Sequence, residues 1–456
     1  MLDDMLDYVE NIRQRPVWQP IPAEKRALFQ EPLPRSAGNL AGAHQIFMQD
    51  ILPYAAGNVH PGFMGWVQGG GAPVGMVADM LAAGLNANLG GRDQMPIEVE
   101  RQVARWMREL FSFPATAGGI FVTGTSMANL MGLLVARTAA LGTAVRRTGL
   151  QENGPHLVAY TSVAAHGCVT QAMDLSGLGT AALRHIPVNA QHQIEIGALE
   201  AAIAADRKAG LRPFFIVGTA GTVDVGAVDN LSALADVAQR EAMWFHVDGA
   251  YGALGMLAPD IAPLLAGIER ADSLAFDFHK WGQVPYDAGF LLVRDASQQL
   301  DTFAAPAAYL QRETRGLAGG SPWPCDLGPD LSRGFRALKT WFTIKVYGGE
   351  RLGQVMSETC RLARYLAAQV EANPALELLA PVALNIVCFR YRCADADSVN
   401  REIVADLQES GIAVPSTTTV DGKLAIRAAI VNHRTGVEDV DKLLSAVLSF
   451  GAVRCK

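Results

Sequence analysis

The sequence predicts an α/β fold built on a buried parallel β-sheet. Four short apolar runs end abruptly in polar residues, as a buried parallel strand does at its carboxyl edge; they lie at 119–123, 214–218, 245–248 and 273–277. The first of them leads through a small, hydroxyl-bearing turn into an apolar helix. Open α/β sheets bind ligands at the carboxyl edge, so we expect the functional residues directly after these strands.

Composition limits the classes of protein to which the chain can belong. Half of its 456 residues are hydrophobic and 18% are charged, which suits a large buried core divided into two or three domains. The formal net charge is -7, from 38 basic and 45 acidic residues, and no basic stripe is present. We therefore expect neither nucleic acid nor an anionic membrane as a partner.

Three further features favour a cytoplasmic enzyme. The first residues are acidic, where a secretion signal needs a basic region and then an apolar run. No segment reaches the ~18 uninterrupted apolar residues that a membrane span requires. The six cysteines are thinly spread without a CxxC spacing, so we expect no disulfide framework and no metal site; they are Cys168, Cys325, Cys360, Cys388, Cys393 and Cys455.

The N-terminal segment reads as an amphipathic helical arm. Apolar residues recur at helical spacing from Leu2 to Ile12, and Pro16 stops that pattern. A second helix is expected at about 41–54. Such an arm has no core of its own, so it packs either on a partner subunit or on its own large domain.

A glycine-rich stretch follows the arm at 60–71. Gly69 begins three consecutive glycines, which let a loop approach a ligand closely or serve simply as a flexible linker. Trp66 and Gln68 lie just before them and are candidates for a substrate pocket.

The turn formed by Gly124, Thr125 and Ser126 opens the helix after the first strand of the sheet. Backbone N–H groups and the helix dipole favour an anion such as phosphate there. Alternatively, Ser126 is a simple N-cap. His166 follows the strand at 157–161 and is either a structural histidine or a ligand-contacting residue at the same edge.

Asp248 ends one of the apolar runs, and Lys280 follows another by three residues. Separately, the carboxylate could cap a helix and the lysine could extend into solvent. Together they match what pyridoxal 5'-phosphate (PLP) requires, because an amine forms the Schiff base and a carboxylate keeps the ring nitrogen protonated.

These segments resemble the PLP-dependent group II amino-acid decarboxylases, which include the aromatic-L-amino-acid, histidine and glutamate decarboxylases. The stretch 246–251 is similar to the family's H-V-D-A-A-Y, and 277–281 is similar to its N-P-H-K-W. The resemblance implies that Lys280 is the Schiff-base lysine and that Asp248 pairs with the pyridine nitrogen. It also implies that Thr125 and Ser126, and more weakly Gly124, hold the phosphate, and that His166 stacks on the ring.

The resemblance extends the cofactor site to Thr222, Ala250, Asp277 and His279. Where members commonly carry a second threonine, this chain has Val223. Trp66, Gln68 and Gly69 fall in a stretch that lines the family's substrate pocket. Asp229 either caps the following helix or orients a neighbouring group, and capping is the simpler interpretation.

The implied fold is that of aspartate aminotransferase (fold type I), with a mostly parallel seven-stranded sheet, a helical N-terminal arm and a small C-terminal α+β domain. We expect an arm and pocket loop at 1–70, a large PLP-binding domain at 71–345 and a small domain at 346–456. The resemblance also implies a homodimer.

The implied activity is decarboxylation of an L-amino acid to an amine and CO2. Trp66 and its apolar neighbours favour an aromatic substrate, whereas Gln68 and Arg92, if they face the pocket, would suit an acidic one. The intact Lys280 argues against a non-enzymatic binding protein.

The segment 311–334 is long, rich in glycine and proline and free of apolar periodicity, which predicts a lid. Many family members carry a proton-donating tyrosine there. In this chain Tyr309 precedes the loop, which itself offers only Trp323 and Cys325. Without that donor, oxidative deamination to an aldehyde becomes an alternative outcome, either as the main reaction or as an oxygen-dependent side reaction.

Overall fold

The computed structural model describes residues 1–151, 154–304, 313–320 and 322–455. The chain forms two compact units, one of residues 1–73 with 359–456 and the other of residues 74–358. The domain boundaries that the sequence suggested, after residues 70 and 345, stay a prediction. No helix of the described residues has the length and apolar character needed to cross a bilayer.

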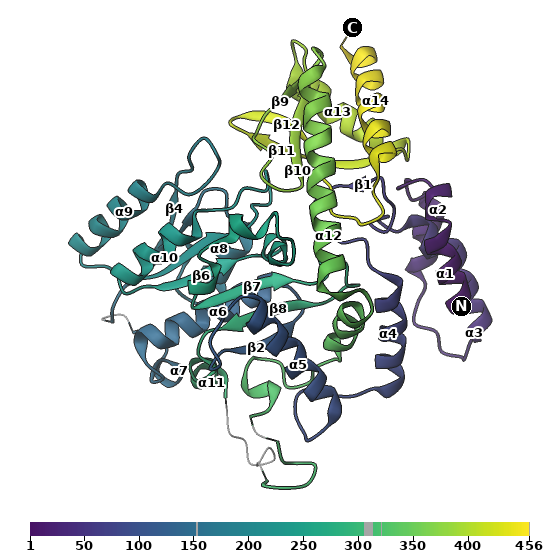
Figure 1. Ribbon diagram of the computed structural model, residues 1–456. Coiled ribbons are helices and arrows are strands. Elements are labelled where there is room, and N and C mark those ends of the chain that lie inside the picture. The colour runs from purple at the N-terminus through teal and green to yellow at the C-terminus, as the bar shows by residue number, and fades with distance from the viewer. Residues whose placement is uncertain (152–153, 305–312, 321, 456) are drawn as a thin grey trace. The chain divides into compact units, whose positions relative to one another are not determined.

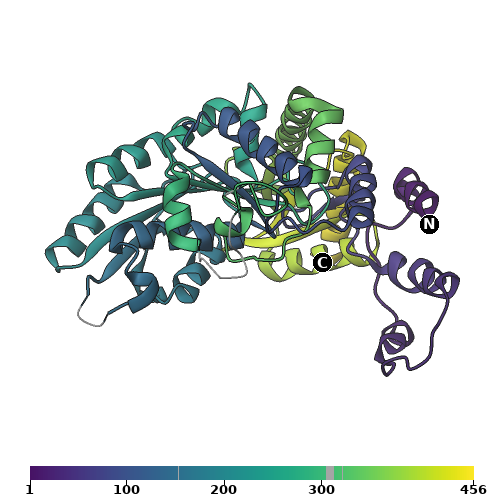
Figure 2. The same ribbon diagram turned by 90° about the horizontal axis from the view of Figure 1, so that it is seen from below.

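The unit of residues 74–358 is built on a seven-stranded sheet with helices on both faces (Figures 1 and 2). Its strands are β2 (Gly118–Val122), β3 (Leu157–Ser162), β4 (Leu183–Ile186), β5 (Arg212–Thr219), β6 (Trp244–Asp248), β7 (Ser273–Asp277) and β8 (Gly289–Val293). Its helices are α4 (Pro73–Leu85), α5 (Met95–Leu110), α6 (Thr125–Leu141), α7 (Val145–Thr148), α8 (Gly167–Leu175), α9 (Ile196–Lys208), α10 (Leu231–Arg240), α11 (Ala296–Phe303) and the start of α12 (Arg336–Ala372).

The strand order is β2-β8-β7-β6-β5-β3-β4. Every neighbouring pair is parallel except the two that include β8. The predicted mostly parallel seven-stranded sheet is therefore confirmed, and the carboxyl ends of β5, β6 and β7 meet at one edge.

Alternation along β6 decides which residues face which helix. His246 and Asp248 point to the face covered by α6, where each forms a hydrogen bond with the side-chain amide of Asn129. Phe245 points to the opposite face, where a side chain on Gly218 would meet both Phe245 and Leu234 of α10. Two polar residues of the strand are thus buried under one helix.

The other unit combines the N-terminal and C-terminal segments. Its sheet has the order β1-β11-β12-β10-β9, from β1 (Phe63–Met64), β9 (Leu376–Leu378), β10 (Ile386–Tyr391), β11 (Val414–Val420) and β12 (Lys423–Ala429). Its helices are α1 (Leu2–Glu10), α2 (Ala23–Ala27), α3 (Leu40–Ile46), α13 (Ala396–Glu409), α14 (Val437–Arg454) and the end of α12.

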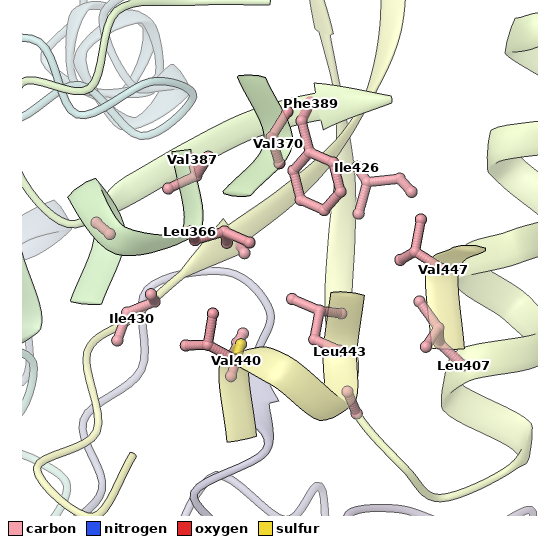
Figure 3. Close-up of a cluster of buried hydrophobic side chains, with 14 of the residues drawn as sticks. Leu366, Val370, Val387, Phe389, Leu407, Ile426, Ile430, Val440, Leu443 and Val447 are labelled. Atoms are coloured by element: carbon pink, nitrogen blue, oxygen red, sulfur yellow. The ribbon is translucent and has the colours of Figure 1, made fainter. Parts of the chain in front are cut away.

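Figure 3 shows the core of this unit, where Leu366, Val387, Phe389 and Leu443 meet between helices and sheet. Asn432 fastens the N-terminal segment to the C-terminal one: its amide donates to the backbone oxygens of Asn58, Val59 and His60 at 3.0–3.2 Å. The predicted helices of the arm are confirmed, since α1 ends before Pro16 and α3 begins at Leu40.

Candidate active site

Asp248 ends β6 at the carboxyl edge of the large sheet and is buried. Its carboxylate accepts the backbone N–H of Ala250 at 3.1 Å and the Nδ2–H of Asn129 at 2.9 Å. Burial raises the pKa of Asp248. The charge of Lys280 and these two N–H groups oppose the rise, and a positive group that faces the carboxyl would favour its ionised form further.

Asp277, His279 and Lys280 lie together where β7 ends. Lys280 Nζ is 3.0 Å from Asp277 Oδ2, and the other carboxylate oxygen accepts the Thr125 N–H at 2.8 Å. His279 Nδ1 accepts the backbone N–H of Ala288 at 3.0 Å, and burial lowers the His279 pKa. Asp277 therefore ties the lysine segment to the start of α6, and the histidine ring is held neutral.

The N-terminus of α6 has the features of an anion site. Its N-cap is Gly124, which has no side chain to satisfy the first backbone N–H groups. Thr125 Oγ1 is buried without a hydrogen-bond partner among the described residues. Ser126 lies in the first turn and is exposed, so its interpretation as the N-cap is wrong. Gly289 allows β8 to pass close by, because a Cβ there would lie 2.4 Å from Gly124.

His166 is the N-cap of α8, and its Nδ1 accepts the Cys168 N–H at 3.2 Å. His166 lies near enough to Asp248 for a positive charge on its ring to lower the pKa of Asp248, which places the histidine in the same cluster. Its stacking role stays a prediction.

Thr222 lies in a tight loop after β5, where its hydroxyl accepts the Ala227 N–H at 3.0 Å. Asp229 ends the same loop and accepts the backbone N–H groups of Ile194 and Thr219 at 2.7 and 2.8 Å. The side chain that caps α10 is Asn230. The prediction that Asp229 is a helix cap is therefore wrong, because its buried carboxylate is already bound to two loops.

The predicted pocket residues Trp66, Gln68 and Gly69 belong to the other compact unit, 1–73 with 359–456. There, Asn58 Nδ2 donates to the Gly69 oxygen at 3.0 Å, and Arg427 donates to the Trp66 oxygen at 3.1 Å. The Trp66 side chain is 54% exposed. Their contribution to a substrate pocket stays a prediction.

The described part of the predicted lid is anchored in its second half. Trp323 is 1% exposed, its indole N–H donates to the Gly319 oxygen at 2.7 Å, and the Arg92 guanidinium lies 4.6 Å from the ring centroid. Arg333 is buried in an ion pair with Glu100 at 2.6 Å. Residues 322–334 are therefore anchored in this structure, and the lid role of the segment stays a prediction; Tyr309, Gln311 and their neighbours at 305–312 lie outside the described residues.

Sequence reasoning missed the residues that surround Asp248 on the α6 side: Asn129, Cys168, His246 and Ser273. His246 could have been suspected, because strand alternation puts it on the face of Asp248. No periodicity indicates which helix residue would meet it.

The residues present fit PLP. A phosphate suits the α6 N-terminus with its unsatisfied Thr125 hydroxyl, a pyridinium suits the buried Asp248 carboxylate, and an aldehyde suits the Lys280 amine. The structure brings these three groups to one sheet edge within the unit 74–358.

Comparison with known proteins agrees with this interpretation. The family model described as "Pyridoxal-dependent decarboxylase conserved domain" matches residues 22–392. An aromatic-L-amino-acid decarboxylase of Bacillus atrophaeus is 32% identical over 98% of this chain and 93% of its own length. A histidine decarboxylase of Drosophila melanogaster is also 32% identical, over 97% of this chain and 53% of its own length.

The crystal structure of Oryza sativa TDC with PLP and tryptamine superposes with a TM-score of 0.92 at 25% identity, covering 100% of this chain and 96% of that one. The fold is thus the expected PLP-dependent transferase fold. The chain belongs to the pyridoxal-dependent decarboxylase family and is a PLP-dependent amino-acid decarboxylase.

Proposed function

We propose that the protein decarboxylates an aromatic L-amino acid and releases the corresponding amine. The observation that carries the proposal is the meeting of Lys280, Asp248 and the α6 N-terminus at one sheet edge, in a chain whose relatives include aromatic-L-amino-acid decarboxylases. The tryptamine named in the Oryza sativa TDC structure supports an aromatic ring in the substrate.

PLP, when bound, supplies an electron-withdrawing ring that accepts the electron pair left by the departing carboxylate. Lys280 would be its covalent attachment point, and Asp277 holds the free amine at 3.0 Å. Asp248 presents a buried negative charge to a protonated ring nitrogen, and low polarity around it strengthens that attraction. Thr125 and the α6 N-terminus would hold the phosphate, and His166 would provide a flat surface for the ring.

The main test combines chemical trapping with a product assay. Borohydride should fix a pyridoxyl group to the peptide that contains Lys280, and mass spectrometry would locate it. Lys280→Ala should lower turnover at least about a hundredfold, equivalent to about 3 kcal/mol in the barrier. Lys208→Ala, at the end of α9, is the control. Wild-type turnover in Lys280→Ala would refute the proposal.

Substrate class is tested by assaying L-tryptophan, L-tyrosine, L-histidine and L-glutamate for CO2, amine, aldehyde and peroxide. We expect the aromatic substrates to have a kcat/KM at least about tenfold above that of L-glutamate. A preference for L-glutamate would overturn the aromatic assignment. Aldehyde and peroxide that form under air but not under nitrogen would instead identify oxidative deamination.

We further propose a homodimer that works in the cytoplasm. The helices α1, α2 and α3 bury none of their residues, while Phe29, Leu33 and Leu40 are all more than half exposed. Such an apolar surface suits an obligate interface between copies of the chain. All six cysteines are described and none forms a disulfide, as is usual in a reducing compartment.

A further inference from the structure

A continuous chain of hydrogen bonds runs behind Asp248 through the interior of the unit 74–358. Trp244 Nε1 donates to Ser273 Oγ at 2.8 Å, and Ser273 Oγ is 2.7 Å from His246 Nδ1. His246 Nε2 is 2.8 Å from Asn129 Oδ1, and Asn129 Nδ2 donates to Asp248 Oδ2 at 2.9 Å. The chain joins three strand residues to the strand-end carboxylate through one helix residue.

Chemistry at the two ends fixes the direction of every bond. An ionised Asp248 only accepts, so Asn129 must present its Nδ2–H to it and its Oδ1 to His246. His246 must then carry its proton on Nε2, which leaves Nδ1 to accept from Ser273. At the other end the indole of Trp244 can only donate, so the Ser273 hydroxyl is free to donate to His246. The Asp248 end requires this histidine tautomer, and the Trp244 end is compatible with it.

Packing holds this arrangement in place. Asn129, His246 and Ser273 are all buried, and the His246 ring stacks on Phe215 with centroids 5.5 Å apart. Gly132 lies one turn after Asn129 on α6, and a Cβ there would come within 3.0 Å of the His246 ring. The helix therefore leaves room for the imidazole where any other residue would press on it.

We propose that Asn129 is a positioning residue that orients the Asp248 carboxylate toward the PLP ring nitrogen, and that His246 and Ser273 keep the Asn129 amide from turning over. The proposal rests on the proposed function. A reversed amide would aim its oxygen at the carboxylate, and two acceptors facing each other in the interior would weaken the negative partner of the pyridinium.

A matched set of variants separates this role from simple filling of the core. Asn129→Leu removes the donor to Asp248. His246→Phe keeps an aromatic ring for Phe215 to stack on but removes the donor to Asn129, whereas His246→Gln keeps an amide donor near the Nε2 position. Thr138→Val is the control, because it removes a buried hydroxyl of the same helix α6 that donates to the Leu134 oxygen and has no link to Asp248 among the described residues.

The readouts are the dissociation constant of PLP, from equilibrium dialysis, and the pH dependence of the visible absorption band of the holoenzyme. We expect Asn129→Leu and His246→Phe to weaken PLP binding by at least about tenfold and to move the midpoint of the pH titration. His246→Gln should bind within about threefold of the wild type, and Thr138→Val should match it.

Two further variants keep the outcome decisive. If His246→Phe does not fold, Ser273→Ala replaces it, and an unchanged pH midpoint in that variant would count against the proposal. Wild-type binding and titration in Asn129→Leu would overturn it, as would His246→Gln being as weak as His246→Phe. Asp248→Ala tests the proposed function separately. If that variant binds PLP with an unchanged affinity and spectrum, the assignment of Asp248 itself fails. If PLP binding is lost in Asp248→Ala but unchanged in Asn129→Leu, only the positioning role is refuted.

Discussion

At the scale of single residues, the site depends on buried groups whose protonation is set by their surroundings. Burial lowers the pKa of His246 to about 3. The neutral imidazole that the hydrogen-bond chain requires is therefore the form that the fold imposes at any pH near neutrality. Burial also raises the pKa of the neighbouring Cys168 thiol to about 12, aided by the charge of Asp248, so this thiol stays protonated.

The low His246 pKa predicts a pH dependence of stability. Below pH 6.5 the histidine of the unfolded chain binds a proton, whereas the folded one does not. The contribution of His246 to the free energy of unfolding is therefore fully present above pH 6.5 and is lost as the pH falls from 6.5 toward 3. The free energy of unfolding should differ between pH 7.5 and pH 5 by about 2 kcal/mol less in His246→Gln than in the wild type.

Urea unfolding of holoenzyme and variant at both pH values measures this effect. His433, whose pKa burial also lowers to about 3, contributes equally to both proteins and cancels in the comparison. Equal pH dependence in wild type and variant would contradict the assignment.

At the scale of elements, the segment that leads into α12 is fixed by one buried ion pair. Arg333 donates to the Glu100 carboxylate of α5 and to the backbone oxygens of Leu89 and Phe121 at 2.6–3.2 Å. The Arg333 backbone also bonds to Leu89 and to the side chain of Asn88. Loop residues, a helix and an edge strand of the large sheet thus converge on one guanidinium.

We expect Arg333→Met to lower the free energy of unfolding by about 3–5 kcal/mol, because the Glu100 carboxylate would be left buried without its partner. Chemical denaturation measures the loss. The control is Arg240→Met, whose pair with Glu200 lies on the surface and should contribute little. Similar small losses in both variants would mean that the Arg333 pair is not the anchor.

At the scale of the whole molecule, the N-terminal arm has apolar residues that no described residue of the same chain covers. Phe29 is 57% exposed, Leu33 73% and Leu40 72%. Monomeric proteins rarely leave such a group of large side chains in water.

Sedimentation at micromolar concentration should therefore show a dimer. Phe29→Glu with Leu40→Glu should shift it toward monomer, since charges would be buried in an apolar interface. Val453→Glu, near the end of α14 and equally exposed, is the control. An active wild-type monomer, or a double variant that stays dimeric, would refute the proposed interface.

Much of this architecture was predictable from local sequence. The apolar runs that end at Asp248 and Asp277 predicted buried parallel strands, because burial on both faces removes the polar alternation of an exposed sheet. The roles of Asp229 and Trp323 were not predictable. The sequence before a helix predicts a cap at a carboxylate such as Asp229, even when that carboxylate bonds to two distant loops instead. A glycine-rich segment likewise predicts a lid, even when a buried tryptophan anchors part of it. Asn129 was missed for the same reason, since its partners are distant in sequence.

The discontinuous unit, in which residues 1–73 fold with 359–456, has a consequence for synthesis in the cell. Strand β1 pairs in parallel with β11, and Asn432 binds the backbone at Asn58. About 350 residues separate these partners, so at ribosomal speed the first segment waits roughly 20–70 seconds for the strand that completes it. During that interval β1 lacks its partner strand β11, and the unit 74–358 can fold before the two strands pair. Strand β1 is thus among the first strands to be made, and its pairing has to wait until the C-terminal segment has been synthesised.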